Sequence, residues 1–135
     1  MIPVLVLTHG NLATELLAAA REIDSQLAEG TSALALPWDI DSDEATKRLR
    51  KAIRELDRGD GVIILTDMFG GTATNIALPL MEAGKTEVVT GVNLPMLVKI
   101  GSLWLQEELS PHDFALRLRD AGQKSIRVAS EFLRR

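Results

Sequence analysis

The sequence predicts an open α/β fold, in which a parallel sheet carries helices on both faces. Short apolar runs at residues 2–7 and 62–65 have the composition of strands that are buried on both sides. Segments with helical periodicity separate the strand-like runs, and this alternation requires right-handed crossovers between parallel strands. We therefore expect a doubly wound, mostly parallel sheet of order 2-1-3-4.

Bulk composition narrows the class of protein. The 135 residues suffice for a single domain over residues 1–135, and 46% apolar with 25% charged residues is typical of a globular chain. A formal net charge of -4 argues against nucleic acid as a partner. Because no segment approaches the roughly 20 apolar residues of a membrane span, we expect no membrane insertion. The chain has no cysteine, which excludes disulfides and thiolate sites, and a cytoplasmic location is expected.

The first half of the chain alternates strand and helix. After the strand that ends in THG, a helix is expected over residues 11–27. Its expected buried face consists of Leu12, Leu16, Ala20, Ile23 and Leu27. Residues 32–36 form a second strand, closed by Pro37. The next helix begins with Asp41 and Glu44 at capping-box spacing.

The second half continues the alternation. A third strand at residues 62–65 leads into a helix at residues 72–83, in which Pro79 would cost about 3 kcal/mol, so that helix either starts near Asn75 or is kinked. Residues 86–90 form a fourth strand, and Pro95 lies in the first turn of the following helix. A further helix starts at Ser110 and runs until Gly122 interrupts it. Residues 125–135 are either a short antiparallel edge strand or more helix.

Two polar residues stand where the chemistry of open α/β sheets is usually located. His9 ends the first strand and Asp67 follows the third, and the expected strand order makes these strands neighbours at the point where the order reverses. A helix amino end disfavours protonation of a histidine, which leaves a neutral imidazole as a nucleophile. Asp67 could fix the tautomer of that ring and stabilise the positive charge that develops during attack.

An anionic group attacked by His9 would need hydrogen-bond donors. Backbone amides around two helix amino ends could supply them, namely those of Gly10, Phe69, Gly70, Gly71 and Thr72. This combination predicts a phosphoryl site. The chain has no P-loop lysine and no GxGxxG pattern, and His9 and Asp67 supply only two metal ligands. We expect no cofactor and no metal.

Three segments together resemble a known family. THG after the first strand, TDMFGGTATN after the third and GVNLPML after the fourth are similar to the active-site segments of enzyme IIA domains of the mannose family of the bacterial sugar phosphotransferase system. The resemblance in element order extends over essentially the whole chain. It implies that His9 accepts a phosphoryl group from the phosphocarrier protein HPr and passes it to an enzyme IIB partner, while Asp67 hydrogen-bonds His9.

The resemblance also implies the lining of the site and the assembly. Phe69, Gly70, Gly71 and Thr72 line the phosphoryl site, with Asn93 in the neighbouring loop. Met68 and Phe69 replace a threonine and a tryptophan of the compared family member, and Thr72-Ala73 replaces serine-proline. No linker to a IIB domain is evident, so the IIB partner is expected on a separate chain. The family forms homodimers by exchanging an edge strand, for which residues 126–129 are the candidate.

Other functions remain as alternatives. The phosphotransfer subunit of dihydroxyacetone kinases shares the fold and a histidine after the first strand. A signalling receiver would use Asp67 but needs an acidic pair after the first strand, where this chain has Thr8 and His9. A flavodoxin-like binder needs a hydroxyl-rich phosphate loop, which is absent.

Three further side chains are of types that often have functions, but the sequence around them shows no pattern of a binding or catalytic site. His112 is expected to be a surface residue. Trp38 and Trp104 are expected to be core or interface aromatics, because no interleaved basic residues suggest a stacking platform.

Overall fold

Four parallel strands form the centre of the molecule. In the computed structural model, which describes residues 1–106 and 108–133, they are arranged in the order β2-β1-β3-β4. Their bounds are β1 (Val4–His9), β2 (Thr31–Leu36), β3 (Val62–Thr66) and β4 (Thr86–Thr90). The predicted fold class and strand order are confirmed.

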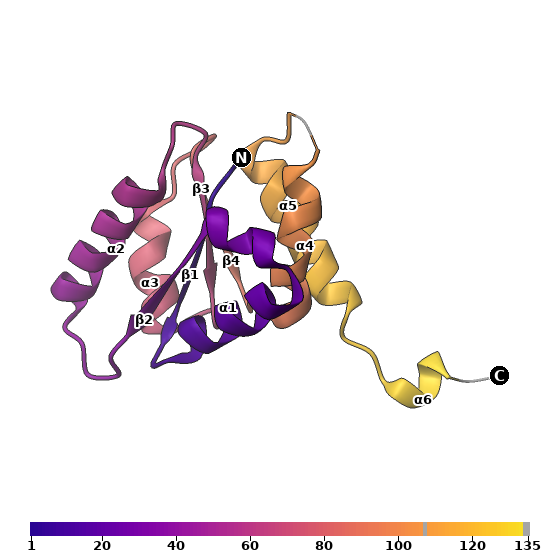
Figure 1. The fold of residues 1–135 in the computed structure, drawn as a ribbon. Coiled ribbons are helices and arrows are strands. Elements are labelled where there is room, and N and C mark those ends of the chain that lie inside the picture. The colour runs from indigo at the N-terminus through magenta and orange to yellow at the C-terminus, as the bar shows by residue number, and fades with distance from the viewer. Residues whose placement is uncertain (107, 134–135) are drawn as a thin grey trace.

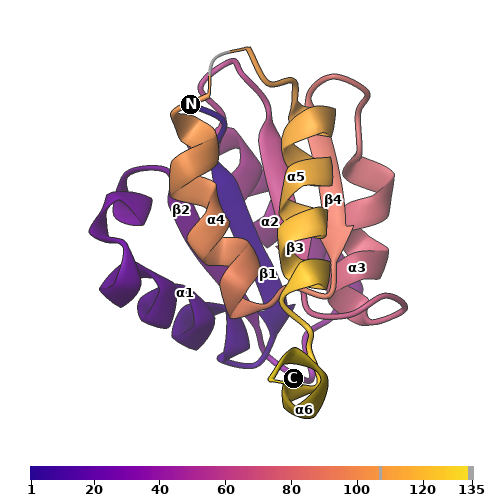
Figure 2. The ribbon, with the colours of Figure 1, turned by 90° about the vertical axis from the view of Figure 1, so that its right-hand side faces the viewer.

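Helices cover both faces of the sheet. Their bounds are α1 (Leu12–Ile23), α2 (Ser42–Leu56), α3 (Thr72–Ala77), α4 (Leu94–Trp104), α5 (Pro111–Lys124) and α6 (Ala129–Phe132), with 3-10 turns η1 (Ser25–Glu29) and η2 (Leu78–Leu80). Helices α2 and α3 lie on one face, and α1, α4 and α5 lie on the other (Figures 1 and 2). Within residues 1–106 and 108–133, no helix has the length and apolar character needed to cross a membrane.

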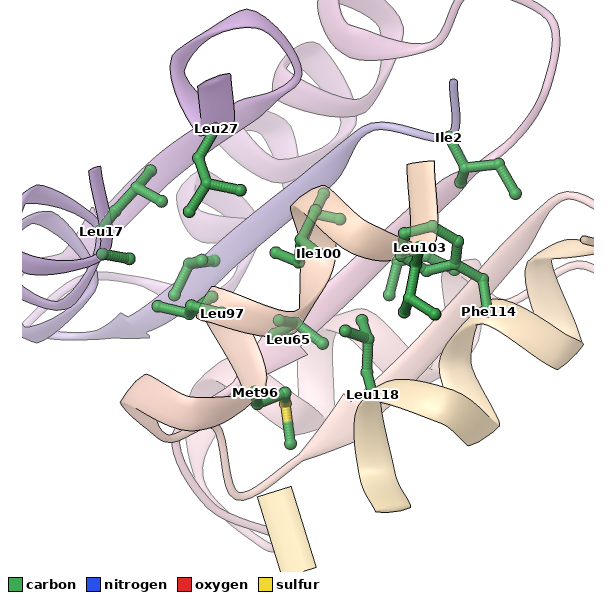
Figure 3. Close-up of a cluster of buried hydrophobic side chains, with 14 of the residues drawn as sticks. Ile2, Leu17, Leu27, Leu65, Met96, Leu97, Ile100, Leu103, Phe114 and Leu118 are labelled. Atoms are coloured by element: carbon green, nitrogen blue, oxygen red, sulfur yellow. The ribbon is translucent and has the colours of Figure 1, made fainter. Parts of the chain in front are cut away.

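The two central strands are buried on both sides. Every residue of segments 4–7 and 62–65 is 0% exposed, as their apolar composition predicted. Alternate side chains enter opposite cores. Val6 and Leu65 pack with α1, α4 and α5, and Figure 3 shows Leu65 in this core. Leu7 and Ile64 pack with α2 and α3. This double burial holds the carboxyl ends of β1 and β3 in place from both faces.

The first helix differs from the sequence-based expectation. α1 ends at Ile23, and Asp24 starts the separate turn η1 by accepting a hydrogen bond from the backbone N–H of Gln26. The buried face consists of Ala13, Leu17 and Ala20, while Leu12 and Ile23 are exposed. Ala20 and Leu27 are buried as predicted, Leu27 within η1. The prediction for Leu12 and Ile23 was wrong because apolar residues surround most of this helix, so their spacing does not select one face.

The positions of Pro79 and Gly122 also correct the prediction. α3 begins at Thr72 and ends at Ala77, and Pro79 lies in the 3-10 turn η2, so the helix neither starts late nor kinks. This arrangement spares Pro79 the lost hydrogen bond and the clash of a helix interior. α5 continues through Gly122 to Lys124. A Cβ atom at Gly122 would lie 3.2 Å from Asn93 Oδ1 and 3.0 Å from Met96 Cε, so this glycine allows α4 and α5 to approach closely.

The carboxyl-terminal segment, as far as residue 133, does not pair with the sheet. Of the two alternatives for it, the described part contains a short helix, α6, preceded by an unpaired stretch at residues 126–128. Figures 1 and 2 show that the chain leaves α5 near the edge of the sheet where the strands end, and that α6 projects away from the body. The possible antiparallel edge strand is therefore absent from residues 1–106 and 108–133 of this chain.

We predict that Asp41→Ala lowers the free energy of unfolding by about 1 kcal/mol, because it removes an N-cap. Asp41 Oδ2 accepts hydrogen bonds from the backbone N–H groups of Asp43 at 3.1 Å and Glu44 at 3.2 Å. Urea unfolding followed by circular dichroism measures the change. Asp39→Ala, an exposed site in the preceding turn, is the control and should change stability by less than about 0.5 kcal/mol. Equal losses in both variants would contradict the capping role.

Candidate functional site

The sheet brings His9 and Asp67 together at its carboxyl edge. β1 and β3 are hydrogen-bonded neighbours with Leu7 opposite Thr66, so the ends of both strands lie at one level. The strand order reverses between these two strands, where open α/β sheets form their crevice. Both side chains are largely buried, with 14% of His9 and 12% of Asp67 exposed.

One carboxylate oxygen orients both the ring and the backbone of His9. Asp67 Oδ2 lies 2.7 Å from His9 Nδ1 and 3.0 Å from the His9 backbone nitrogen. An ionised carboxylate only accepts hydrogen bonds, so Nδ1 carries the proton in this pair. In the neutral ring, Nε2 then keeps its lone pair and is available as a nucleophile.

The charge of Asp67 is stabilised locally. Burial by itself raises the pKa of Asp67. This effect is outweighed by hydrogen bonds from the His9 backbone and ring, by the attraction to His9, and by a hydrogen bond from the Met68 backbone. The pKa of this carboxyl therefore lies below its ordinary value of 3.8. Asp67 is an anion, and thus a hydrogen-bond acceptor for His9, throughout the neutral pH range.

Buried threonine hydroxyls hold the two loops of the site. Thr8 Oγ1 accepts a hydrogen bond from the Ala13 backbone N–H at 2.6 Å, which ties the first turn of α1 to β1. Thr74 Oγ1 donates to the Met68 carbonyl at 2.5 Å and lies 2.7 Å from Thr66 Oγ1. These roles of Thr8, Thr66 and Thr74 were not among the sequence-based expectations. The available signal was that a threonine directly precedes both His9 and Asp67 at the end of an otherwise apolar strand.

The loop after Asp67 supplies open backbone amides. A Cβ atom at Gly71 would lie 2.8 Å from His9 Cε1, so only a glycine lets this backbone reach the imidazole. Across residues 1–106 and 108–133, the amides of residues 69–72 donate to no protein acceptor. Phe69 is 74% and Met68 58% exposed beside the site, while Thr72 is half-buried as the first residue of α3.

Two of the predicted site residues have other roles in the structure. The Gly10 amide donates to the Leu36 carbonyl at 2.7 Å, so it is already used in pairing β1 with β2 and is not the free donor that we expected. Asn93 is the N-cap of α4: its Oδ1 accepts from the Met96 backbone N–H at 3.0 Å, and its Nδ2 donates to the Gly122 carbonyl at 3.2 Å. The site role of Asn93 stays a prediction.

Trp38 lies against His9, contrary to expectation. Its ring stacks on the imidazole with centroids 5.1 Å apart and an interplanar angle of 19°. The side chain is 79% exposed and therefore does not belong to the core. A signal existed in the sequence, because Trp38 follows a strand predicted to lie beside the one that ends in His9. Trp104 is partly buried and donates from Nε1 to the Ile2 carbonyl at 2.8 Å, whereas His112 is exposed, as expected.

The fold and its carboxylate-oriented histidine define an α/β domain suited to nucleophilic group transfer. A family model described as PTS system fructose IIA component matches residues 3–112. The protein belongs to this family of the sugar phosphotransferase system, as the three resembling segments implied, and its function is that of a phosphoryl carrier.

Individual proteins and solved structures are similar to this chain over nearly its whole length. The PTS system fructose-specific EIIA component of Bacillus subtilis strain 168 is 29% identical over 136 residues, covering 98% of this chain and 90% of that protein. The PTS IIA protein associated with the fucose utilization operon of Streptococcus pneumoniae superposes with a TM-score of 0.82 at 26% identity, covering 97% and 95% of the two chains. The component EIIA of Streptococcus agalactiae, at 24% identity, shares the fold, with a TM-score of 0.82 over 97% and 99% of the two chains.

We predict that Asp67→Asn destabilises the protein by about 1.5 kcal/mol at pH 7, because the hydrogen bonds of His9 lose their charged acceptor. Since the folded pKa of Asp67 is lowered, its stabilising contribution is present above the unfolded pKa and is lost as pH falls through the folded pKa. Urea unfolding at a series of pH values should therefore show that the difference in the free energy of unfolding between wild type and Asp67→Asn narrows as the pH falls below about 4.

Thr14→Ala is the control for this pH series, since Thr14 is exposed on α1 and does not titrate. Its difference from wild type should stay constant with pH. If the difference in the free energy of unfolding between wild type and Asp67→Asn stayed unchanged down to pH 2, this would contradict the assignment of Asp67 as an anion.

Proposed function

We propose that His9 is the phosphoryl acceptor of this carrier, receiving the group from phosphorylated HPr and passing it to an enzyme IIB partner. The observation that carries the proposal is the contact of 2.7 Å between His9 Nδ1 and Asp67 Oδ2, which leaves Nε2 as the nucleophile. Membership of this phosphotransferase-system family supports a phosphoryl group as the group that is transferred. Residues 1–135 would act as one carrier domain in the cytoplasm.

The transfer step requires no residue besides those at the carboxyl edge of the sheet. The Nε2 lone pair forms a bond to phosphorus, the bond between phosphorus and its donor atom breaks, and that electron pair returns to the donor. The Nδ1 proton stays in its hydrogen bond to Asp67. The imidazole becomes positively charged, and the adjacent carboxylate stabilises it through this hydrogen bond. Transfer to the IIB partner is the same step in reverse.

Backbone dipoles would hold the phosphoryl oxygens. The amides of residues 69–72 have no protein acceptor among the described residues and precede or begin α3 beside His9. Their partial positive charges favour an anion. Donation by backbone amides also tolerates Met68 in place of a residue with a hydroxyl.

We predict that His9→Ala takes up no phosphate and that Asp67→Ala is phosphorylated about 10–100-fold more slowly, because its imidazole is no longer oriented. Incubation with phosphoenolpyruvate, enzyme I and HPr, followed by intact mass, measures both. The wild-type product should be labile in acid and stable in alkali. His112→Ala, which removes the other histidine, is the matched control and should gain one phosphate at the wild-type rate. Full phosphate uptake by His9→Ala would refute the assignment.

We also propose that the carrier is a homodimer in which the carboxyl-terminal segment of one subunit contacts the other. Ile126 is 78%, Val128 64% and Phe132 65% exposed on this projecting segment. β4 is an edge strand of the sheet and offers unpaired backbone groups. Packing of this segment against β4 of the other subunit would bury the apolar side chains and pair the open backbone groups of the edge. The resemblance to the mannose family implies such an exchange.

We predict that a double variant with Ile126→Asp and Val128→Asp is monomeric, because the charges oppose burial of the segment. Sedimentation equilibrium should give the 14.7 kDa of one chain for this variant, and twice that mass for the wild type. Glu131→Ala on the same segment is the control and should stay dimeric. A monomeric wild type, or a dimeric double variant, would contradict the proposal.

A further inference from the structure

Trp38 lies against the imidazole of His9, and the carrier function leaves this exposed aromatic side chain unexplained. A tryptophan that is 79% exposed forgoes most of the stabilisation that burial would give it. Among the residues that the structure describes, its aromatic contact is with His9, and its indole N–H donates no hydrogen bond to the protein. One face of this side chain is thus committed to the imidazole.

The backbone around Trp38 places the indole over His9. β1 and β2 pair with His9 opposite Leu36, so the chain leaves β2 directly beside the histidine. A turn closed by the hydrogen bond from the Ile40 N–H to the Pro37 carbonyl, at 3.1 Å, holds Trp38 at its tip. Gly10 has φ +55°, and a Cβ atom there would lie 2.8 Å from Trp38 Nε1. The absence of a side chain at Gly10 therefore makes room for the indole.

We infer that Trp38 is a positioning residue for phosphoryl transfer, an inference that rests on the proposed acceptor role of His9. The hydrogen bond from Nδ1 to Asp67 restrains one edge of the ring, but a single hydrogen bond tolerates a range of angles and so still allows the ring to tilt. Stacking at an interplanar angle of 19° fixes the plane of the ring as well. Together the two contacts direct Nε2 toward the incoming phosphorus.

The stacked indole also favours the charged form of the ring. The imidazole gains positive charge as the bond between Nε2 and phosphorus forms, and the face of an indole attracts a cation. This attraction is larger in the transition state than in the neutral ground state, so it accelerates the step. An interaction of this kind corresponds to a rate effect of roughly 3- to 30-fold.

Two variants and two phosphoryl donors test this role. Trp38→Leu removes the aromatic face, whereas Trp38→Phe retains one. Phosphorylated HPr is the protein donor, and phosphoramidate is a small donor that needs no docking surface. For Trp38→Leu we expect the rate constant at saturating HPr to fall roughly 3- to 30-fold, KM to change less than about twofold, and phosphoramidate transfer to slow by the same factor. Trp38→Phe should restore most of the rate.

A spectroscopic readout accompanies the kinetics. The ring protons of His9 lie against the indole and should move downfield in the NMR spectrum of Trp38→Leu, because the ring-current shift of the stack is lost. Trp104→Phe is the matched control, since Trp104 lies away from the site and bonds to Ile2. It should leave the transfer rates and the His9 signals unchanged.

The outcomes separate this inference from the proposed function. A raised KM for HPr with unchanged phosphoramidate transfer would make Trp38 a docking residue and overturn the inference. Unchanged rates with both donors would overturn it too. In either case His9 would still be phosphorylated, so the proposed function would stand. Absence of phosphate on His9 in the wild type would overturn both.

Discussion

The parallel pairing of β1 with β3 is the constraint on which the rest of the structure depends. Both strands are sealed by helices on each face, and their register sets Leu7 opposite Thr66. His9, two residues after Leu7, and Asp67, directly after Thr66, can meet only because this register holds their backbones at one level. A shift of one residue would turn every side chain of a strand to the other face, which both apolar cores prevent.

The site works with very few charged groups. Asp67 is held as an anion by hydrogen bonds that outweigh the cost of its burial, and all but one of these come from His9 itself. The phosphoryl group would meet backbone amides and no cationic side chain among the residues identified at the site. Such an arrangement suits a carrier, because a group that must be passed on should not be bound too strongly.

Small residues create the close approaches in this site. Gly71 lets the loop after β3 reach one edge of the imidazole, and Gly10 leaves space for the indole of Trp38. His9 is thereby contacted by the segments that follow β2 and β3, although β1 carries it. Side-chain hydroxyls of Thr8 and Thr74 then fix the two loops to their strands.

The sequence by itself determined the class of fold and the two polar residues at the strand ends, because buried strands and the chemistry of their carboxyl ends are local patterns. The strand order that brings this pair together was an expectation, which the tertiary structure confirmed. It also identified the capping role of Asp41. Only the tertiary structure decided which face of α1 is buried, that the Gly10 amide is used in the sheet, and that Trp38 stacks on His9. Each of these depends on contacts between segments far apart in the chain, and no periodicity within one segment encodes them.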